Sequence, residues 1–67
     1  MTSDLDIYRA ANELIEQHGD EAPIHAAKRA DEMLEAGDMD GKAVWLRILN
    51  AVDKLLARKQ PEGARVH

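Results

Sequence analysis

The 67-residue chain carries a net charge of −4, is 45% apolar and contains no cysteine. A chain of this length forms one small domain, and without cysteine it has no disulfide, no thiolate metal ligand and no thiol nucleophile. No apolar run approaches the roughly 20 residues that span a bilayer, and the first residues lack the basic start and apolar centre of a signal peptide. We therefore expect a cytoplasmic protein with no membrane segment.

The first expected helix covers residues 4–18. Ser3 is its predicted N-cap, accepting a hydrogen bond from the amide of Asp6, and Gly19 ends it because glycine adopts a positive φ without a Cβ clash. Apolar residues recur at helical spacing and predict one buried face. That face comprises Ile7, Tyr8, Ala11, Leu14, Ile15 and His18.

A second helix is expected over residues 21–36. Asp20 is its predicted N-cap, Pro23 suits its first turn, and Gly37 follows its end. Its inner face is rich in small side chains, which let two helices approach closely; these positions are Ala26, Ala27, Ala30, Met33 and Leu34. Ile24 falls outside this face, so either it packs on the preceding turn or it is exposed.

The third expected helix, residues 39–59, holds the only tryptophan and the densest large apolar residues. We favour Asp38 over Asp40 as its N-cap, because Met39 could then pack inward. The apolar stripe predicts the main core face and comprises Val44, Trp45, Ile48, Leu49, Val52, Leu55 and Leu56. Gln60 and Pro61 end the helix.

Short links between these helices predict that neighbours in sequence run antiparallel. The expected fold is all-α, a compact three-helix bundle over residues 1–59, followed by a disordered tail at residues 60–67. Fifteen large apolar residues make up its predicted core. A core of this size rarely supplies more than about 3–5 kcal/mol, so self-association is one way to bury more surface.

Two stretches resemble a family of small uncharacterised alphaproteobacterial helical proteins. They are DIYRAANELIEQHG, residues 6–19, and the stretch from Ala26 to Ile48 that contains G-D-x-x-G-x-A-x-W-x-R-I. The resemblance covers about residues 6–56 and implies a bacterial helical domain. It carries over no catalytic residue, because the family has no assigned activity.

The chemistry-bearing residues predict neither an enzyme nor a metal or cofactor site. His18 is expected to cap the end of the first helix, His25 lies beside Arg29, and no HxxxH or HxxE spacing falls within one expected helix. Paired carboxylates fall on exposed faces or in caps, whereas acid–base catalysis needs a shifted pKa inside a cleft. The D-M-D-G run lacks the closing glutamate of a calcium loop. We therefore expect no catalytic residue.

Charge is uneven, since residues 42–67 hold six bases and two acids while the first 21 residues hold six acids and one base. A basic third helix is typical of helix-turn-helix proteins, but the acidic helices beside it disfavour phosphate binding. The sequence predicts a small acidic module or regulator that binds an unidentified protein; the alternative is a nucleic-acid-binding accessory factor that uses the third helix.

Four residues are the candidate protein-binding positions: Arg9, Ile24, Leu46 and Arg47. The two arginines are expected to pair with acids of neighbouring helices, or else to lie beside a partly exposed aromatic residue as in a binding hot spot. Leu46 is predicted to face away from the core. A homodimer through Leu46 and Ile24 is a further alternative.

Overall fold

The computed structural model describes residues 3–59, and these residues form three helices. α1 spans Asp4–His18, a 3₁₀ turn covers Gly19–Glu21, α2 spans Ala22–Glu35 and α3 spans Met39–Lys59. No strand occurs in this part of the chain, so the predicted all-α, compact three-helix fold is confirmed. The predicted disordered tail, residues 60–67, lies outside the described residues. Within residues 3–59, no helix has the length and apolar character needed to cross a bilayer.

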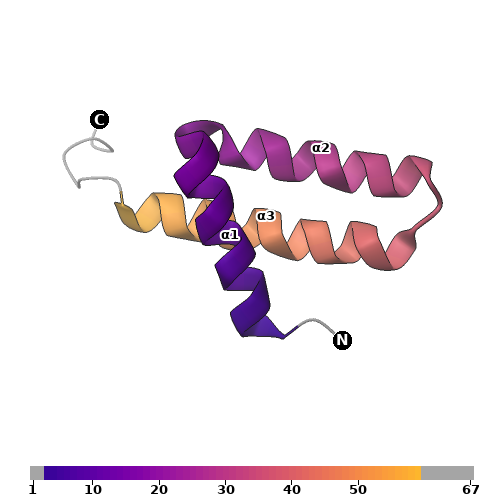
Figure 1. Cartoon of the computed structure of the whole chain (residues 1–67), viewed down its shortest axis with the longest axis horizontal. Coiled ribbons are helices and arrows are strands. Elements are labelled where there is room, and N and C mark those ends of the chain that lie inside the picture. Colours follow the sequence, from indigo (N-terminus) through magenta and orange to yellow (C-terminus); the bar gives the residue numbers. More distant parts are fainter. Residues whose placement is uncertain (1–2, 60–67) are drawn as a thin grey trace.

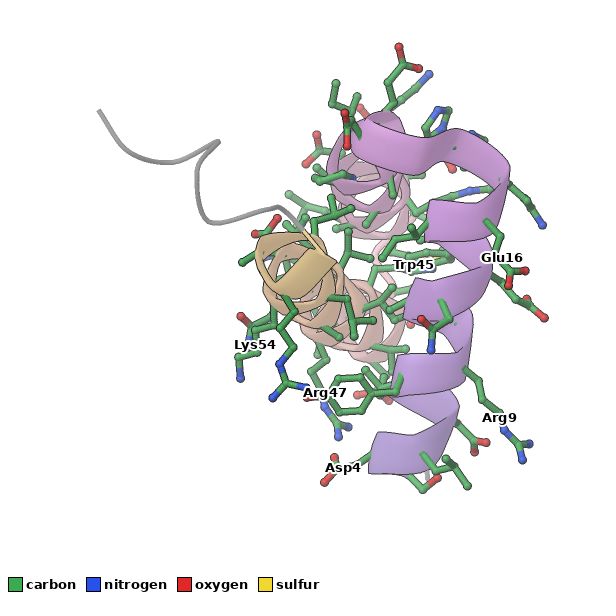
Figure 2. The ribbon with its side chains drawn as sticks, turned by 90° about the vertical axis from the view of Figure 1, so that its left-hand side faces the viewer. Asp4, Arg9, Glu16, Trp45, Arg47 and Lys54 are labelled. Atoms are coloured by element: carbon green, nitrogen blue, oxygen red, sulfur yellow. The ribbon has the colours of Figure 1, made fainter. Side chains whose placement is uncertain are left out.

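α2 and α3 form an antiparallel hairpin, and α1 crosses this hairpin steeply on one side (Figure 1). A view turned by 90° shows α2 and α3 nearly end on, with α1 running along their flank (Figure 2). The prediction that α1 and α2 are antiparallel is therefore wrong. Their link is a single 3₁₀ turn, in which the Ala22 amide donates to the Gly19 carbonyl, and so short a turn bends the chain at a corner without reversing it.

Local capping rules explain most of the helix ends. The Ser3 hydroxyl accepts from the Asp6 amide at 3.2 Å, and Gly19 ends α1 with a φ of 59°, as predicted. Pro23 lies in the first turn of α2, also as predicted. Asp20 is not the N-cap of α2: it lies within the 3₁₀ turn, Glu21 holds the cap position, and no side chain caps this end. The 3₁₀ turn leads directly into α2 and takes the place of a side-chain cap.

Asp38 caps α3, because its Oδ1 accepts from the Gly41 amide at 2.8 Å. The preference for Asp38 over Asp40 is thus confirmed, and Gly37 ends the preceding segment with a φ of 78°. The expected inward packing of Met39 is wrong, since this side chain is exposed. Met39 is the first residue of α3 and lies on the opposite side of that helix from its buried stripe.

Small residues dominate the core at the place where the three helices meet. The buried residues are Ile7, Ala11, Ile15, Ala22, Ala26, Ala30, Ile48, Ala51 and Val52. Alanine at these contacts lets the helix backbones approach closely, and larger side chains such as Trp45 and Leu49 pack around them, half-buried. Four of the fifteen large apolar residues of the predicted core are instead exposed, namely Leu5, Tyr8, Ile24 and Leu34. The predicted core also omitted the buried residues Ala22 and Ala51.

Candidate protein-binding surface

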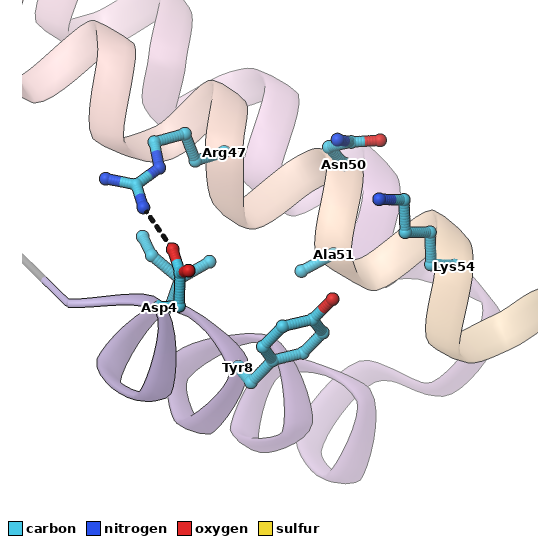
Figure 3. Close-up of a pocket in the computed structure, with 7 residues that line it drawn as sticks. Asp4, Tyr8, Arg47, Asn50, Ala51 and Lys54 are labelled. Carbon is cyan, nitrogen blue, oxygen red and sulfur yellow. Dashed lines mark hydrogen bonds and ion pairs between the residues drawn. The ribbon is translucent and has the colours of Figure 1, made fainter.

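A shallow pocket of about 230 Å³ lies between the N-terminal half of α1 and the middle of α3 (Figure 3). The two helices diverge here, because α1 crosses the hairpin steeply and its N-terminal end extends past α3 (Figure 1). The residues that line the pocket are Asp4, Ile7, Tyr8, Arg47, Asn50, Ala51 and Lys54. The buried residues Ile7 and Ala51 supply its apolar part, and the others supply a polar rim.

An ion pair between α1 and α3 closes one end of the pocket. An Arg47 guanidinium nitrogen lies 2.7 Å from Asp4 Oδ1, as the dashed line in Figure 3 shows. The expectation that Arg47 pairs with an acid of a neighbouring helix is therefore confirmed. Both side chains are largely exposed, at 47% for Arg47 and 88% for Asp4, so the pair stabilises the fold by less than about 1 kcal/mol. Its clearer consequence is that it holds the guanidinium at the pocket.

Three other polar groups on the rim have no protein partner within the described residues. They are the Tyr8 hydroxyl, the Asn50 amide and the Lys54 ammonium group. Figure 3 shows the Tyr8 ring rising from α1 with its hydroxyl directed toward α3, where Asn50 and Lys54 lie. A hydroxyl, an amide and an ammonium group all donate hydrogen bonds, so the rim offers several donors that are open to a ligand.

On both helices an exposed leucine lies one helical turn from a residue that lines the pocket. Leu5 is 60% exposed and precedes Tyr8 by three residues on α1, and Leu46 is 45% exposed and precedes Asn50 by four residues on α3. Residues three or four apart are neighbours on a helix surface. Tyr8 itself is 41% exposed. We call this combined surface the α1–α3 face; it comprises Leu5, Tyr8, Leu46, Arg47, Asn50 and Lys54.

The structure brings together only part of the predicted binding set. Leu46 and Arg47 both belong to the α1–α3 face, and Leu46 is exposed as predicted. Arg9 points away from the bundle on the other side of α1 from Arg47 (Figure 2), and it has no ion pair within the described residues. The expected pairing of Arg9 with an acid of a neighbouring helix is therefore wrong. Ile24 is 62% exposed near the start of α2, which resolves the alternative left open by the sequence.

Two side-chain contacts were not predicted from the sequence. The Arg29 guanidinium carbon lies 6.0 Å from the centre of the Trp45 ring, which is cation–π range and joins α2 to α3. The rings of His18 and His25 stack with centroids 3.6 Å apart and planes inclined by 18°. His18 therefore packs across the corner between α1 and α2, where a helix-capping role was expected. The seven-residue spacing of the two histidines around Gly19 was the available signal.

Within residues 3–59, no group of three histidine, aspartate or glutamate side chains is arranged to hold a metal ion. In the same part of the chain, no charged or polar residue belongs to the buried core. The expectations of no enzyme activity and no cofactor stay predictions.

In comparisons with known proteins, no family model, characterised protein or solved structure matches the chain. The resemblance to small alphaproteobacterial helical proteins is untested by these comparisons and stays a prediction.

Proposed function

We propose that this protein is a small helical interaction module that binds another protein through the α1–α3 face. The observation that carries the proposal is a pocket lined by exposed Tyr8 and by unpartnered donors, with exposed Leu5 and Leu46 one helical turn away from the lining residues Tyr8 and Asn50. Tyrosine and arginine are enriched at binding hot spots, where an anchor fills a pocket within a ring of near-neutral contacts. Tyr8 and Arg47 both line the pocket here.

The same surface favours a protein partner over a nucleic acid. Arg47 is paired with Asp4, whose side chain is 88% exposed. A phosphate backbone approaching the pocket would meet this carboxylate, whereas phosphate binding depends on several uncompensated lysine and arginine contacts. A folded protein or peptide presents mixed chemistry, which suits a face of leucines, a tyrosine and a few charges.

A homodimer is the alternative that uses the same chemistry, because Leu46 is exposed and available to a second copy. Light scattering behind a sizing column, at several protein concentrations, separates a monomer of 7.5 kDa from a dimer. We further propose a cytoplasmic location, in keeping with a chain that has no cysteine. Fractionation of the source cells tests that location.

Site-specific photo-crosslinking in the source cells tests the interaction. A photoreactive residue at Leu5 should capture one defined partner, and the same residue at exposed Lys28 on α2 should not. Leu46→Glu should abolish the capture, since it replaces an exposed leucine of the α1–α3 face with a charged side chain. Leu34→Glu is a matched control, because Leu34 is 46% exposed against 45% for Leu46 but lies on α2.

The proposal fails if the Lys28 position captures the same protein equally well, or if Leu34→Glu reduces capture as much as Leu46→Glu does. Capture of a second copy of this chain, and of nothing else, would replace the proposed partner with self-association. Capture of nucleic acid at Leu5 would favour the alternative function as an accessory factor that uses α3.

A further inference from the structure

We infer that the pocket between α1 and α3 is a carboxylate site, which receives an aspartate or glutamate side chain of the partner protein. This inference rests on the proposed function and names the partner chemistry that the α1–α3 face selects. It follows from the donors on the rim, the net charge of the lining and the apolar surface on either side of the pocket.

The donors on the rim match a carboxylate in chemical type, and they come from both helices. Tyr8 comes from α1, while Asn50 and Lys54 come from successive turns of α3, so the two helices approach a bound group from two sides (Figure 3). None of these three polar groups has a protein partner within residues 3–58. A carboxylate has two oxygens that accept several hydrogen bonds, and bonds from a charged donor such as Lys54 are the stronger ones.

The charge of the lining selects a single carboxylate over a polyanion. Lys54 and Arg47 are cationic and Asp4 is anionic, so the lining carries one net positive charge. Asp4 already accepts from Arg47 at 2.7 Å, which leaves Lys54 as the cation without an ion pair in the described part of the lining. One net positive charge complements one carboxylate, and a phosphate chain would bring further negative charges against Asp4.

The apolar parts of the site define the neighbours of that carboxylate. Ile7 and Ala51 are the buried apolar residues of the pocket lining, and exposed Leu5 and Leu46 lie one helical turn from the lining residues Tyr8 and Asn50. A partner segment with an acidic residue between apolar ones would place its charge at Lys54 and its apolar side chains on the leucines. The acidic partner segment is thus amphipathic and short enough to lie across two helices.

The test is an NMR titration of the full chain, labelled with ¹⁵N, against two capped peptides that differ in one residue. One peptide is acetylated and amidated Leu-Glu-Leu, and the other is the same peptide with glutamine in place of glutamate. The glutamate peptide should shift the amide signals of Tyr8, Asn50, Ala51 and Lys54 in a saturable way. The glutamine peptide should bind at least threefold more weakly, roughly the effect of losing one exposed charged pair.

Two pairs of variants assign the binding to the pocket. Lys54→Met should weaken the glutamate peptide roughly threefold to fivefold, and addition of salt should reduce this difference because the charges are exposed. Lys28→Met is the matched control on α2 and should leave the affinity unchanged. Tyr8→Phe removes one hydroxyl from the rim and should weaken binding of the glutamate peptide by a smaller factor than Lys54→Met does. Asn12→Ala on the same helix is its control and should leave the affinity unchanged.

Equal binding of both peptides, shifts that map away from the pocket, or an unchanged affinity in Lys54→Met would each overturn the inference. Stronger shifts at the same residues with a short single-stranded oligonucleotide would also overturn it, in favour of a phosphate site. If crosslinking at Leu5 still captures a partner while both peptides bind equally, only the carboxylate inference fails. If the glutamate peptide binds selectively but no partner is captured, the proposed function fails and the site remains.

Discussion

The first turn of α3 provides a test of side-chain placement, because Gly41→Ala should behave differently with and without Asp38. A Cβ atom at position 41 would lie 2.7 Å from Asp38 Oδ2 and 2.8 Å from Met33 Sδ, so both side chains must move. Asp38 Oδ1 accepts from the Gly41 amide at 2.8 Å, and displacement of this carboxylate therefore disturbs the N-cap of α3.

Two opposing effects give the size of the change. Alanine is favoured over glycine in a helix by up to about 1 kcal/mol, and loss of an N-cap costs about 1 kcal/mol. Gly41→Ala alone should therefore change the free energy of unfolding by less than about 0.5 kcal/mol. In an Asp38→Ala background the cap is already absent and Met33 is flexible, so the same change should stabilise by about 1 kcal/mol.

Urea unfolding of the four proteins, followed by far-ultraviolet circular dichroism, measures this double-mutant cycle. Ala43→Gly is the calibration, since Ala43 is exposed in the same helix and its replacement should destabilise by about 1 kcal/mol in either background. If Gly41→Ala stabilises the protein equally with and without Asp38, the carboxylate does not lie against Gly41 and the reasoning is refuted.

Three further changes test the core, the corner and the pocket. Val52→Ala shortens the largest fully buried side chain among the described residues and should destabilise the protein by about 2 kcal/mol. Leu46→Ala should destabilise it by less than half as much. Equal unfolding midpoints of the two variants in urea would contradict this packing. Gly19→Ala forces alanine to adopt the backbone angles φ 59° and ψ −130°, while its Cβ would have no atom within 4 Å. Backbone strain alone should therefore destabilise the protein by about 1–3 kcal/mol. An unchanged thermal unfolding midpoint would count against that geometry. Asp4→Asn breaks the ion pair with Arg47, so the free energy of unfolding should fall by less than about 1 kcal/mol. The change also makes the pocket more positive, so its affinity for the glutamate peptide should rise roughly twofold at low salt. Weaker binding of that peptide in the NMR titration would contradict the expected effect of charge.

The candidate site was only partly predictable from the sequence. The third-helix pattern placed Leu46 outside the apolar stripe, and the expected pairing of Arg47 with a neighbouring acid is observed with Asp4. The sequence did not indicate that Tyr8 would be exposed beside Lys54, because helical periodicity assigned Tyr8 to the buried face of its helix. Whether a residue on that face is covered depends on where the next helix passes, and periodicity carries no such information.

The sequence by itself determined the three helices and most of their ends. Ser3, Gly19 and Asp38 act through bonds and torsions within a few residues of themselves, so local rules suffice for them.

Only the tertiary structure decided the steep crossing of α1, the alanine-rich contact around Ala11 and Ala26, and the pocket between α1 and α3. The crossing direction depends on which small side chains meet across helices. It then settles the exposure of Leu5 and Tyr8, because the end of α1 extends past α3 and leaves both residues uncovered.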